Sequence, residues 1–361
     1  MYPGLAHLYR RAYSGINYRL RGFAGSRFAS SCRPVSIGLL LTERCNAKCI
    51  HCDIWKNRGQ EASPSLDQWK QLLLDFSRWL GPIHVALSGG EALLRPWTPE
   101  LVAYGSSLGL FIEVLTHGYW LEQSRIEQMA LANPSRITVS VDGIGEIHSR
   151  IRGREKFWDY TYASLLNIIR LRKEHNLKYS IRLKTVIMDQ NVDGVADVAR
   201  FAAQNGMEVF YQPIEQNYNT EEDPDWFHHS PTWPRDKAQA VRAVEELIRM
   251  KQSGSPIANS MAQLQAMIPY FQDPDAMRVR VQGHAGHEER PFCGALTTIQ
   301  LQANGDVTAC CSKPPVGNIK ELPIRTIWEN RPHWWEEGCC METRFSAAEK
   351  EQAAGLVTLS R

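Results

Sequence analysis

The chain has 361 residues, of which 43% are hydrophobic and 22% are charged, and its formal net charge is +2 at pH 7. This nearly neutral balance excludes a protein built around nucleic-acid binding, which needs a strongly basic surface. No run approaches the roughly 18 consecutive apolar residues of a membrane-spanning helix, so a spanning segment is excluded as well.

The nine cysteines are concentrated near the two ends of the chain. Disulfide frameworks are typical of short secreted domains with evenly spread cysteines, a pattern that this chain does not have. Clustered thiols in a chain of this length favour metal ligands in a reducing compartment, so we expect a cytoplasmic protein. The cysteines are Cys32, Cys45, Cys49, Cys52, Cys293, Cys310, Cys311, Cys339 and Cys340.

The first elements belong to a basic N-terminal arm, which we assign to residues 1–35. Residues 1–34 contain six arginines, no acidic residue and interleaved large apolar side chains, without the continuous apolar run of a signal peptide. Three interpretations are open: an arm packed on the main domain, an organellar transit peptide, or a segment that contacts an anionic membrane. A membrane-associated location is therefore one alternative to a purely cytoplasmic one.

Residues 36–215 alternate short apolar runs with segments of helical periodicity. Val, Ile and Leu dominate the short runs, which indicates parallel strands buried on both faces. The predicted strands are 36–41, 83–87, 111–115, 137–141, 180–187 and 208–211. The predicted helices between them are 66–80, 99–107, 121–132, 160–175 and 192–205. Ser65 is the expected N-cap of the first helix and Gly206 the expected end of the last.

Six strand–helix units in succession predict a parallel sheet with right-handed crossovers. A closed barrel of this kind has eight units, so we expect an α/β fold with a partial, curved (β/α)6 barrel. Chemistry in such folds lies at the C-terminal ends of the strands. The unusual residues should therefore follow directly after each strand.

Three cysteines follow the first strand. Cys45, Cys49 and Cys52 lie on one loop at spacings of four and three residues, so their thiols can converge on one metal centre. Structural zinc sites and iron–sulfur cubes normally use four protein ligands, and three thiols leave one position of a cube open. The alternatives are coincidence or a zinc site completed by His51.

Polar residues also follow the later strands. Ser88-Gly89-Gly90-Glu91 comes after the second, where the glycines can expose backbone N–H groups and Glu91 can bind an ammonium group. Thr116 follows the third predicted strand, and Ser140 begins the polar segment at the end of the fourth. Possible acid–base groups follow too, although such residues more often cap loops or form salt bridges: Asp142, His148 and Glu215.

The cysteine loop and the Gly-Gly-Glu turn resemble the core of radical S-adenosylmethionine enzymes. The resemblance covers residues 36–214, with Ala92 and His117 departing from the residues that are frequent in the family. It implies that Cys45, Cys49 and Cys52 bind three irons of a [4Fe–4S] cluster whose fourth iron binds S-adenosylmethionine. The expected contacts to that cofactor come from Ser88, Gly89, Gly90, Glu91, His51, Thr116, Ser140 and Arg182.

Individual roles follow from the same resemblance. The Ser88–Glu91 turn would meet the amino group of the cofactor, and Ser140 its ribose or methionine. Arg182 would bind the carboxylate, and the His51 ring would stack on adenine. The implied chemistry is reductive cleavage of S-adenosylmethionine to a 5′-deoxyadenosyl radical, which abstracts hydrogen from a substrate C–H bond, with the protein aiming the radical and excluding water.

The remaining chain divides into three predicted segments. Residues 216–285 are expected to form a helical connecting segment, with helices at 237–250 and 259–271. Residues 286–345 should form a small cysteine-rich domain, because Asn304-Gly305 between alternating runs predicts a β-hairpin. Residues 346–361 are assigned as a tail.

The spacing from Cys293 through Gly305 to Cys310 is similar to the SPASM extension or its shorter twitch form. This resemblance implies one auxiliary [4Fe–4S] cluster, since the full form uses more cysteines than remain; a zinc-stabilised hairpin is the alternative. Cys311 is expected to point away from Cys310, and could donate hydrogen to a substrate radical or be structural. The best auxiliary ligands are Cys293, Cys310, Cys339 and Cys340.

We therefore expect a radical S-adenosylmethionine enzyme that carries out a small-molecule oxidation or rearrangement. The arm is too short for the separate peptide-recognition domain of many peptide-modifying members. A peptide or lipid substrate is the alternative within the family, and a non-catalytic iron–sulfur or zinc protein is the alternative outside it. An electron donor such as flavodoxin or ferredoxin is the expected partner.

Overall fold

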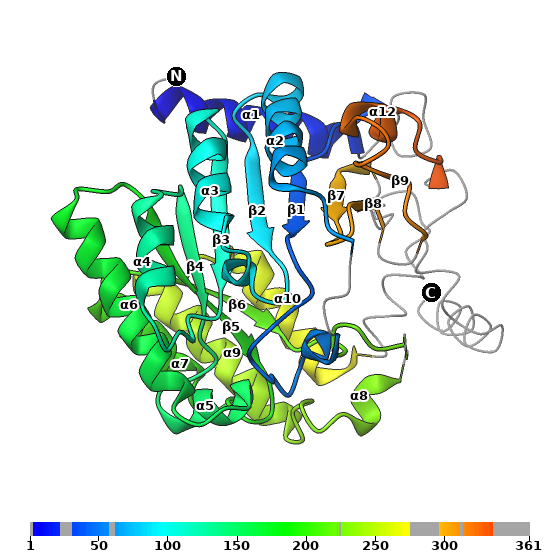
Figure 1. The fold of residues 1–361 in the computed structure, drawn as a ribbon. Coiled ribbons are helices and arrows are strands. Elements are labelled where there is room, and N and C mark those ends of the chain that lie inside the picture. Colours follow the sequence, from blue (N-terminus) through cyan, green and yellow to red (C-terminus); the bar gives the residue numbers. More distant parts are fainter. Residues whose placement is uncertain are drawn as a thin grey trace, which may run out of the picture.

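The computed structural model describes residues 3–21, 31–57, 62–221, 223, 225–274, 296–310 and 313–334. Within these residues the strands form one nine-stranded sheet in the order β6-β5-β4-β3-β2-β1-β7-β8-β9 (Figure 1). The strands are β1 (Ser36–Leu40), β2 (His84–Ser88), β3 (Phe111–Thr116), β4 (Arg136–Ser140), β5 (Ser180–Ile187), β6 (Glu208–Pro213), β7 (Thr298–Leu301), β8 (Asp306–Thr308) and β9 (Gly317–Asn318).

The six predicted parallel strands are confirmed, because β1 to β6 pair in chain order and all in parallel. The open sheet matches the predicted partial barrel. The strands are not equally buried on their two faces, however: residues of β5 alternate between fully and half-buried along its whole length. The half-buried side chains face the barrel interior, and this alternation leaves room for a cavity there.

Helices cover the outer face of the sheet (Figure 1). Ser65 caps α2 as predicted, in a capping box in which its side chain accepts a hydrogen bond from the Gln68 amide. Gly206 follows α7 with a φ of 63°, in the left-handed region that a helix-ending glycine adopts. The helices around the sheet are α2 (Leu66–Leu80), α3 (Thr98–Ser107), α4 (Ser124–Leu131), α5 (Glu146–Arg152), α6 (Phe157–Glu174), α7 (Val195–Gln204), α9 (Lys237–Gln252) and α10 (Met261–Gln272).

Helix α5 was not predicted from the sequence. Several short helices and turns complete the connections between the main elements. The additional helices are α8 (Trp226–His229), α12 (Ile324–Glu329) and the 3-10 turns η2 (Ile54–Lys56) and η3 (Ala92–Leu94). Among the described residues, none of the helices combines the length and the apolar character needed to cross a bilayer.

The N-terminal arm contains helix α1 (Pro3–Arg21), which runs across the end of the sheet where the strands begin (Figure 1). Its Tyr9 hydroxyl donates a hydrogen bond to the Leu80 carbonyl at 2.7 Å, and its Tyr13 hydroxyl donates to the Pro34 carbonyl at 2.7 Å. The arm therefore packs on the main domain, at the end opposite the predicted site.

The predicted hairpin at Asn304-Gly305 is present, with β7 and β8 antiparallel and Gly305 at a φ of 94°. Its position was not anticipated, because β7 also pairs in parallel with β1 and so continues the barrel sheet. Helix α12 follows the hairpin. The predicted division into segments at residues 215, 285 and 345 stays a prediction.

Candidate active site

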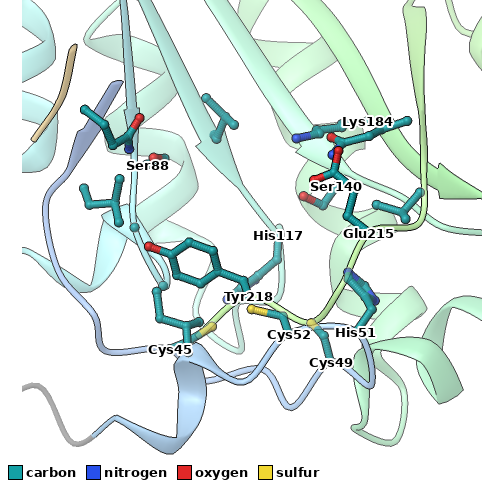
Figure 2. A pocket seen from close by; sticks show the side chains of 18 of the residues that line it. Cys45, Cys49, His51, Cys52, Ser88, His117, Ser140, Lys184, Glu215 and Tyr218 are labelled. Atoms are coloured by element: carbon teal, nitrogen blue, oxygen red, sulfur yellow. The ribbon is translucent and has the colours of Figure 1, made fainter. Parts of the chain in front are cut away.

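A cavity of about 750 Å³ opens at the C-terminal ends of the strands, where the fold predicts a site. The loop after β1 forms one side of it, and Cys45, Cys49 and Cys52 all line it (Figure 2). The described cysteines form no disulfide bond. All three thiols of the motif are thus brought to one side of one cavity.

The end of α5 holds the cysteine loop in place. The Lys48 amide donates to the Arg152 carbonyl at 3.0 Å, and the Ile50 amide donates to the Ile151 carbonyl at 3.0 Å. Gly153 follows with a φ of 69°, and a Cβ atom there would lie 2.1 Å from the Lys48 carbonyl oxygen. Only glycine allows the two backbones to approach this closely.

The Gly-Gly turn packs against the start of the same loop. A Cβ at Gly89 would lie 2.4 Å from the Thr42 carbonyl oxygen, and one at Gly90 2.3 Å from the Arg44 carbonyl oxygen. The Gly90 and Glu91 amides donate to these same two carbonyls at 2.8 and 2.9 Å. The expectation that the glycines offer their N–H groups to a ligand is therefore wrong for Gly90, although Ser88 and both glycines line the cavity.

Glu91 is buried at the cavity wall, with a side chain that is 1% exposed. Its carboxylate accepts hydrogen bonds from the Leu93 amide at 3.1 Å, the Thr116 hydroxyl at 3.0 Å and the His117 amide at 2.9 Å. Burial raises the pKa of this carboxyl to about 7. Thr116, a predicted cofactor contact, also lines the cavity and donates its hydroxyl proton to Glu91.

A buried ion pair lies behind Cys49. Arg152 Nη2 is 2.6 Å from Asp142 Oδ2, and Arg152 Nη1 donates to Cys49 Sγ at 3.6 Å. Burial tends to raise the pKa of Asp142, but the Arg152 charge outweighs this and the pKa is lowered. The Asp142 amide donates to His148 Nδ1 at 3.1 Å. Asp142 and His148 do not line the cavity, so their positions indicate support for the loop rather than acid–base chemistry.

Three polar residues that were predicted from the sequence line the cavity: His51, Ser140 and Glu215. Lys184, which was not predicted, lines it as well. Figure 2 shows Ser140, Lys184 and Glu215 as a group from the ends of β4 to β6. Burial lowers the pKa of His51 to about 4, and its Nδ1 atom is buried without a hydrogen-bond partner. A neutral imidazole with an unused nitrogen suits a stacking or hydrogen-bonding role toward a bound molecule.

Arg182 does not lie at the cavity, and its predicted carboxylate contact is not supported. Its guanidinium binds Glu208 Oε1 at 2.8 Å through Nε and at 2.7 Å through Nη2. Both residues lie near the N-terminal ends of their strands. Lys184 is on the same face of β5 but one pleat closer to the C-terminal end, and it lines the cavity instead.

The hairpin also contributes to the cavity wall. Gln300, Gln302 and Cys310 line the same cavity as the three-cysteine loop, because β7 lies beside β1. The other predicted auxiliary-cluster ligands lie outside the described residues, as does the predicted hydrogen donor Cys311. The auxiliary ligand set therefore stays a prediction. The residues in question are Cys293, Cys339 and Cys340.

Sequence reasoning missed several lining residues. Gln300 lies in β7 and Gln302 follows its last residue, and both could be found only by knowing that β7 joins the barrel. Tyr218 lies in the segment after β6, where its carbonyl accepts a hydrogen bond from the Asp53 amide at 3.0 Å. One feature of the sequence could have pointed to Arg152. It is followed by Gly153 at the end of a short charged segment, where a glycine indicates a close backbone contact.

The donor set fits the implied cofactors. Three thiols in one cavity wall suit an iron–sulfur cluster, for which thiolates are the normal ligands. Within the part of the chain that the structure describes, no three His, Cys, Asp or Glu side chains are arranged around the position of a single metal ion. A four-iron cluster is wider than one ion, and its ligands stand correspondingly further apart.

Comparisons with known proteins agree with this geometry. The model of the Radical SAM superfamily matches residues 39–202, and the model of the SPASM iron–sulfur cluster-binding domain matches residues 293–350. Together these ranges cover more than half of the chain.

Two curated relatives match along most of their length. The AdoMet-dependent heme synthase of Methanosarcina barkeri is 25% identical over 82% of this chain and 82% of that protein. The pre-heme d1 synthase of Dinoroseobacter shibae is 24% identical over 80% of this chain and 71% of that protein.

Among solved structures, Streptococcus suis SuiB bound to S-adenosylmethionine has a TM-score of 0.61 at 14% identity. The match covers 83% of this chain and 67% of SuiB, which has also been solved with its precursor peptide SuiA. At this identity the likeness concerns the fold. Motif, family models and fold agree, and the chain belongs to the radical SAM superfamily of iron–sulfur enzymes, with a C-terminal SPASM domain.

Proposed function

We propose that this radical SAM enzyme oxidises or rearranges a small molecule in a biosynthetic pathway. The observation that supports this most strongly is one shared cavity of about 750 Å³ that Cys45, Cys49, Cys52 and Cys310 all line. A C–H bond in this cavity would be within reach of both predicted clusters. A cavity of this size suits a compact substrate.

The residues of this chain have distinct roles in the proposal. Cys45, Cys49 and Cys52 hold the first cluster, and the buried Arg152 guanidinium fixes Cys49. When bound, the cluster and S-adenosylmethionine supply the carbon radical that abstracts hydrogen from the substrate. Ser88, Ser140 and His51 position the cofactor, and Cys310 contributes to the auxiliary cluster, which would accept an electron in an oxidation.

The substrate class rests on the relatives that match over most of the chain. Both are named for the synthesis of heme or pre-heme d1, which are small molecules. Gln212, Gln300 and Gln302 line the cavity and offer hydrogen bonds to a polar substrate, whereas the Lys184 ammonium group, which also lines it, takes the role of binding the carboxylate of S-adenosylmethionine. A peptide substrate is the second candidate, because SuiB, which has been solved with a precursor peptide, shares the fold over 83% of this chain.

The reaction also requires an external electron donor. A reduced flavodoxin or ferredoxin is the proposed partner, since the first cluster must receive one electron for each cofactor molecule cleaved. A peripheral membrane contact is a separate proposal that concerns the arm at the other end of the barrel.

The test is anaerobic reconstitution, reduction with dithionite and chromatography for 5′-deoxyadenosine. We expect the product from the wild-type chain and from Cys32→Ala, whose side chain is buried and does not line the cavity. We expect none from Cys49→Ser. A wild-type protein that carries an intact cluster yet forms no 5′-deoxyadenosine contradicts the proposal.

The substrate class is tested with deuterated cell extract separated into small metabolites and peptides. Deuterium transferred into 5′-deoxyadenosine from the metabolite fraction supports a small-molecule substrate. Transfer from the peptide fraction alone overturns that part of the proposal and leaves the radical chemistry intact.

A further inference from the structure

Helix α1 presents an exposed apolar face. Leu5, Leu8 and Ile16 are 56%, 60% and 57% exposed. With Ala12, which is also exposed, they are spaced three, four and four residues apart and so form one stripe along the helix. A stripe of large aliphatic side chains open to solvent is costly unless another apolar phase covers it.

The opposite face of α1 is fixed to the barrel, which determines where the stripe points. Tyr9 and Tyr13 donate to backbone carbonyls of the main domain at 2.7 Å each. Arg10 donates to the Pro82 carbonyl at 3.3 Å and lies over the Phe111 ring, 4.9 Å from its centroid. Asn17 is buried. The stripe is therefore the outer face of a docked helix.

The charge around the stripe is of one sign. Arg11 and Arg19 are exposed on α1, and residues 1–34 contain six arginines and no acidic residue. Arg11 lies beside the exposed apolar stripe, and Arg19 continues it three residues after Ile16. Such a combination matches the two layers of an anionic bilayer surface, phosphate groups outside and acyl chains beneath. A purely apolar protein partner would leave these charges unpaired.

We propose that α1 binds the surface of an anionic membrane, with Leu5, Leu8 and Ile16 inserted among the acyl chains and Arg11 and Arg19 on the lipid phosphates. Helix α1 lies across the end where the strands begin, and the cavity opens at the end where they finish (Figure 1). A protein docked in this way turns the mouth of its cavity away from the bilayer. The contact therefore localises the enzyme without delivering a lipid to its active site.

The experiment is co-sedimentation of the reconstituted full chain with vesicles of phosphatidylcholine alone or mixed with phosphatidylglycerol. We expect binding to the mixed vesicles that is at least roughly tenfold tighter than to the neutral ones and that weakens as salt is added. Equal binding to both vesicles, or binding to neither, overturns the proposal.

Variants locate the contact. Replacing Leu5, Leu8 and Ile16 with Ser should weaken binding to the mixed vesicles roughly tenfold or more, and Arg11→Gln with Arg19→Gln should remove the preference for anionic lipid. The control replaces other exposed leucines with Ser and should bind like wild type. These are Leu121, Leu131 and Leu322, which are 68%, 47% and 48% exposed.

Two further results decide against the membrane. A triple Ser variant of α1 that binds vesicles as tightly as wild type places the contact elsewhere. Light scattering that shows a wild-type dimer, which the triple variant converts to a monomer, assigns the stripe to a second copy of the chain. Formation of 5′-deoxyadenosine should be the same in all these variants, which separates this proposal from the proposed function.

Discussion

A single side chain, that of Arg152, connects the cysteine loop to the segment that follows β4. Its guanidinium forms an ion pair with Asp142 at 2.6 Å and a hydrogen bond to Cys49 Sγ at 3.6 Å. Both charged side chains are buried. A buried pair of this kind adds little net stability, but removing one partner leaves the other charge without compensation.

The first prediction follows from this pair. Arg152→Met should lower the free energy of unfolding by about 3–5 kcal/mol, because the Asp142 carboxylate is left buried and unpaired. The double variant Arg152→Met, Asp142→Asn should recover part of that loss. The measurement is urea unfolding of the cluster-free protein. Equal losses in the single and double variants would show that the pair is not the cause.

The second prediction separates Lys184 from Arg182. Lys184 lines the cavity, and no described residue forms a hydrogen bond or ion pair with its ammonium group, whereas Arg182 is paired with Glu208. Lys184→Met should weaken the binding of S-adenosylmethionine roughly tenfold, in line with the ~1.5–3 kcal/mol of a hydrogen bond to a charged group.

Equilibrium dialysis against the reconstituted protein measures this affinity. Arg182→Met is the control and should bind the cofactor like wild type while losing stability. The assignment fails if Arg182→Met weakens binding more than Lys184→Met. Sequence reasoning chose Arg182, because strand alternation gives the face of the sheet and not the depth along the barrel.

Backbone contacts between elements shape the site as much as side chains do. The cysteine loop is held by the end of α5 and by the Gly-Gly turn after β2, through hydrogen bonds of 2.8–3.0 Å. Sequence reasoning singled out Gly89 and Gly90 in the turn but suggested a ligand as the reason for them. The actual reason is the close approach of the loop backbone, which no local pattern reveals.

The third prediction tests this docking with a matched pair of glycines. Gly153 and Gly206 have similar φ values of 69° and 63°, so an alanine is strained at both. A Cβ at Gly153 would lie 2.1 Å from the Lys48 carbonyl oxygen, whereas nothing lies within 4 Å of one at Gly206. Gly153→Ala should therefore displace the cysteine loop and lose most of the iron bound at Cys45, Cys49 and Cys52.

Gly206→Ala should retain that iron. The readout is the iron content and visible spectrum of each reconstituted protein. Equal iron in the two variants would mean that the loop finds its position without α5.

At the scale of the whole molecule, all the strands of the described residues belong to one sheet, in which the C-terminal hairpin continues the barrel. The six parallel strands and most helices could be predicted, since their apolar periodicity is local. The placement of β7 beside β1 could not, because it pairs residues more than 250 positions apart. Consequently sequence reasoning named the cysteines on the β1 loop but missed Gln300 and Gln302, which line the same cavity.

The fourth prediction concerns this arrangement. Deleting residues 286–361 removes β7 and leaves β1 as an exposed, apolar edge strand, which favours aggregation. The shortened chain should be recovered mostly as aggregate, whereas deletion of residues 346–361 alone should leave it monodisperse. Sedimentation velocity measures both. A monodisperse chain ending at residue 285 would support an independently folding barrel instead.

The central claim is that the three thiols of the β1 loop leave one iron of a cluster open to S-adenosylmethionine. It is tested most directly by electron–nuclear double resonance of the reduced, reconstituted protein with the cofactor labelled by 15N in its amino group and 17O in its carboxylate. The account predicts hyperfine coupling from both labels, with both signals lost in Cys49→Ser. An intact reduced cluster that shows coupling to neither label would contradict it.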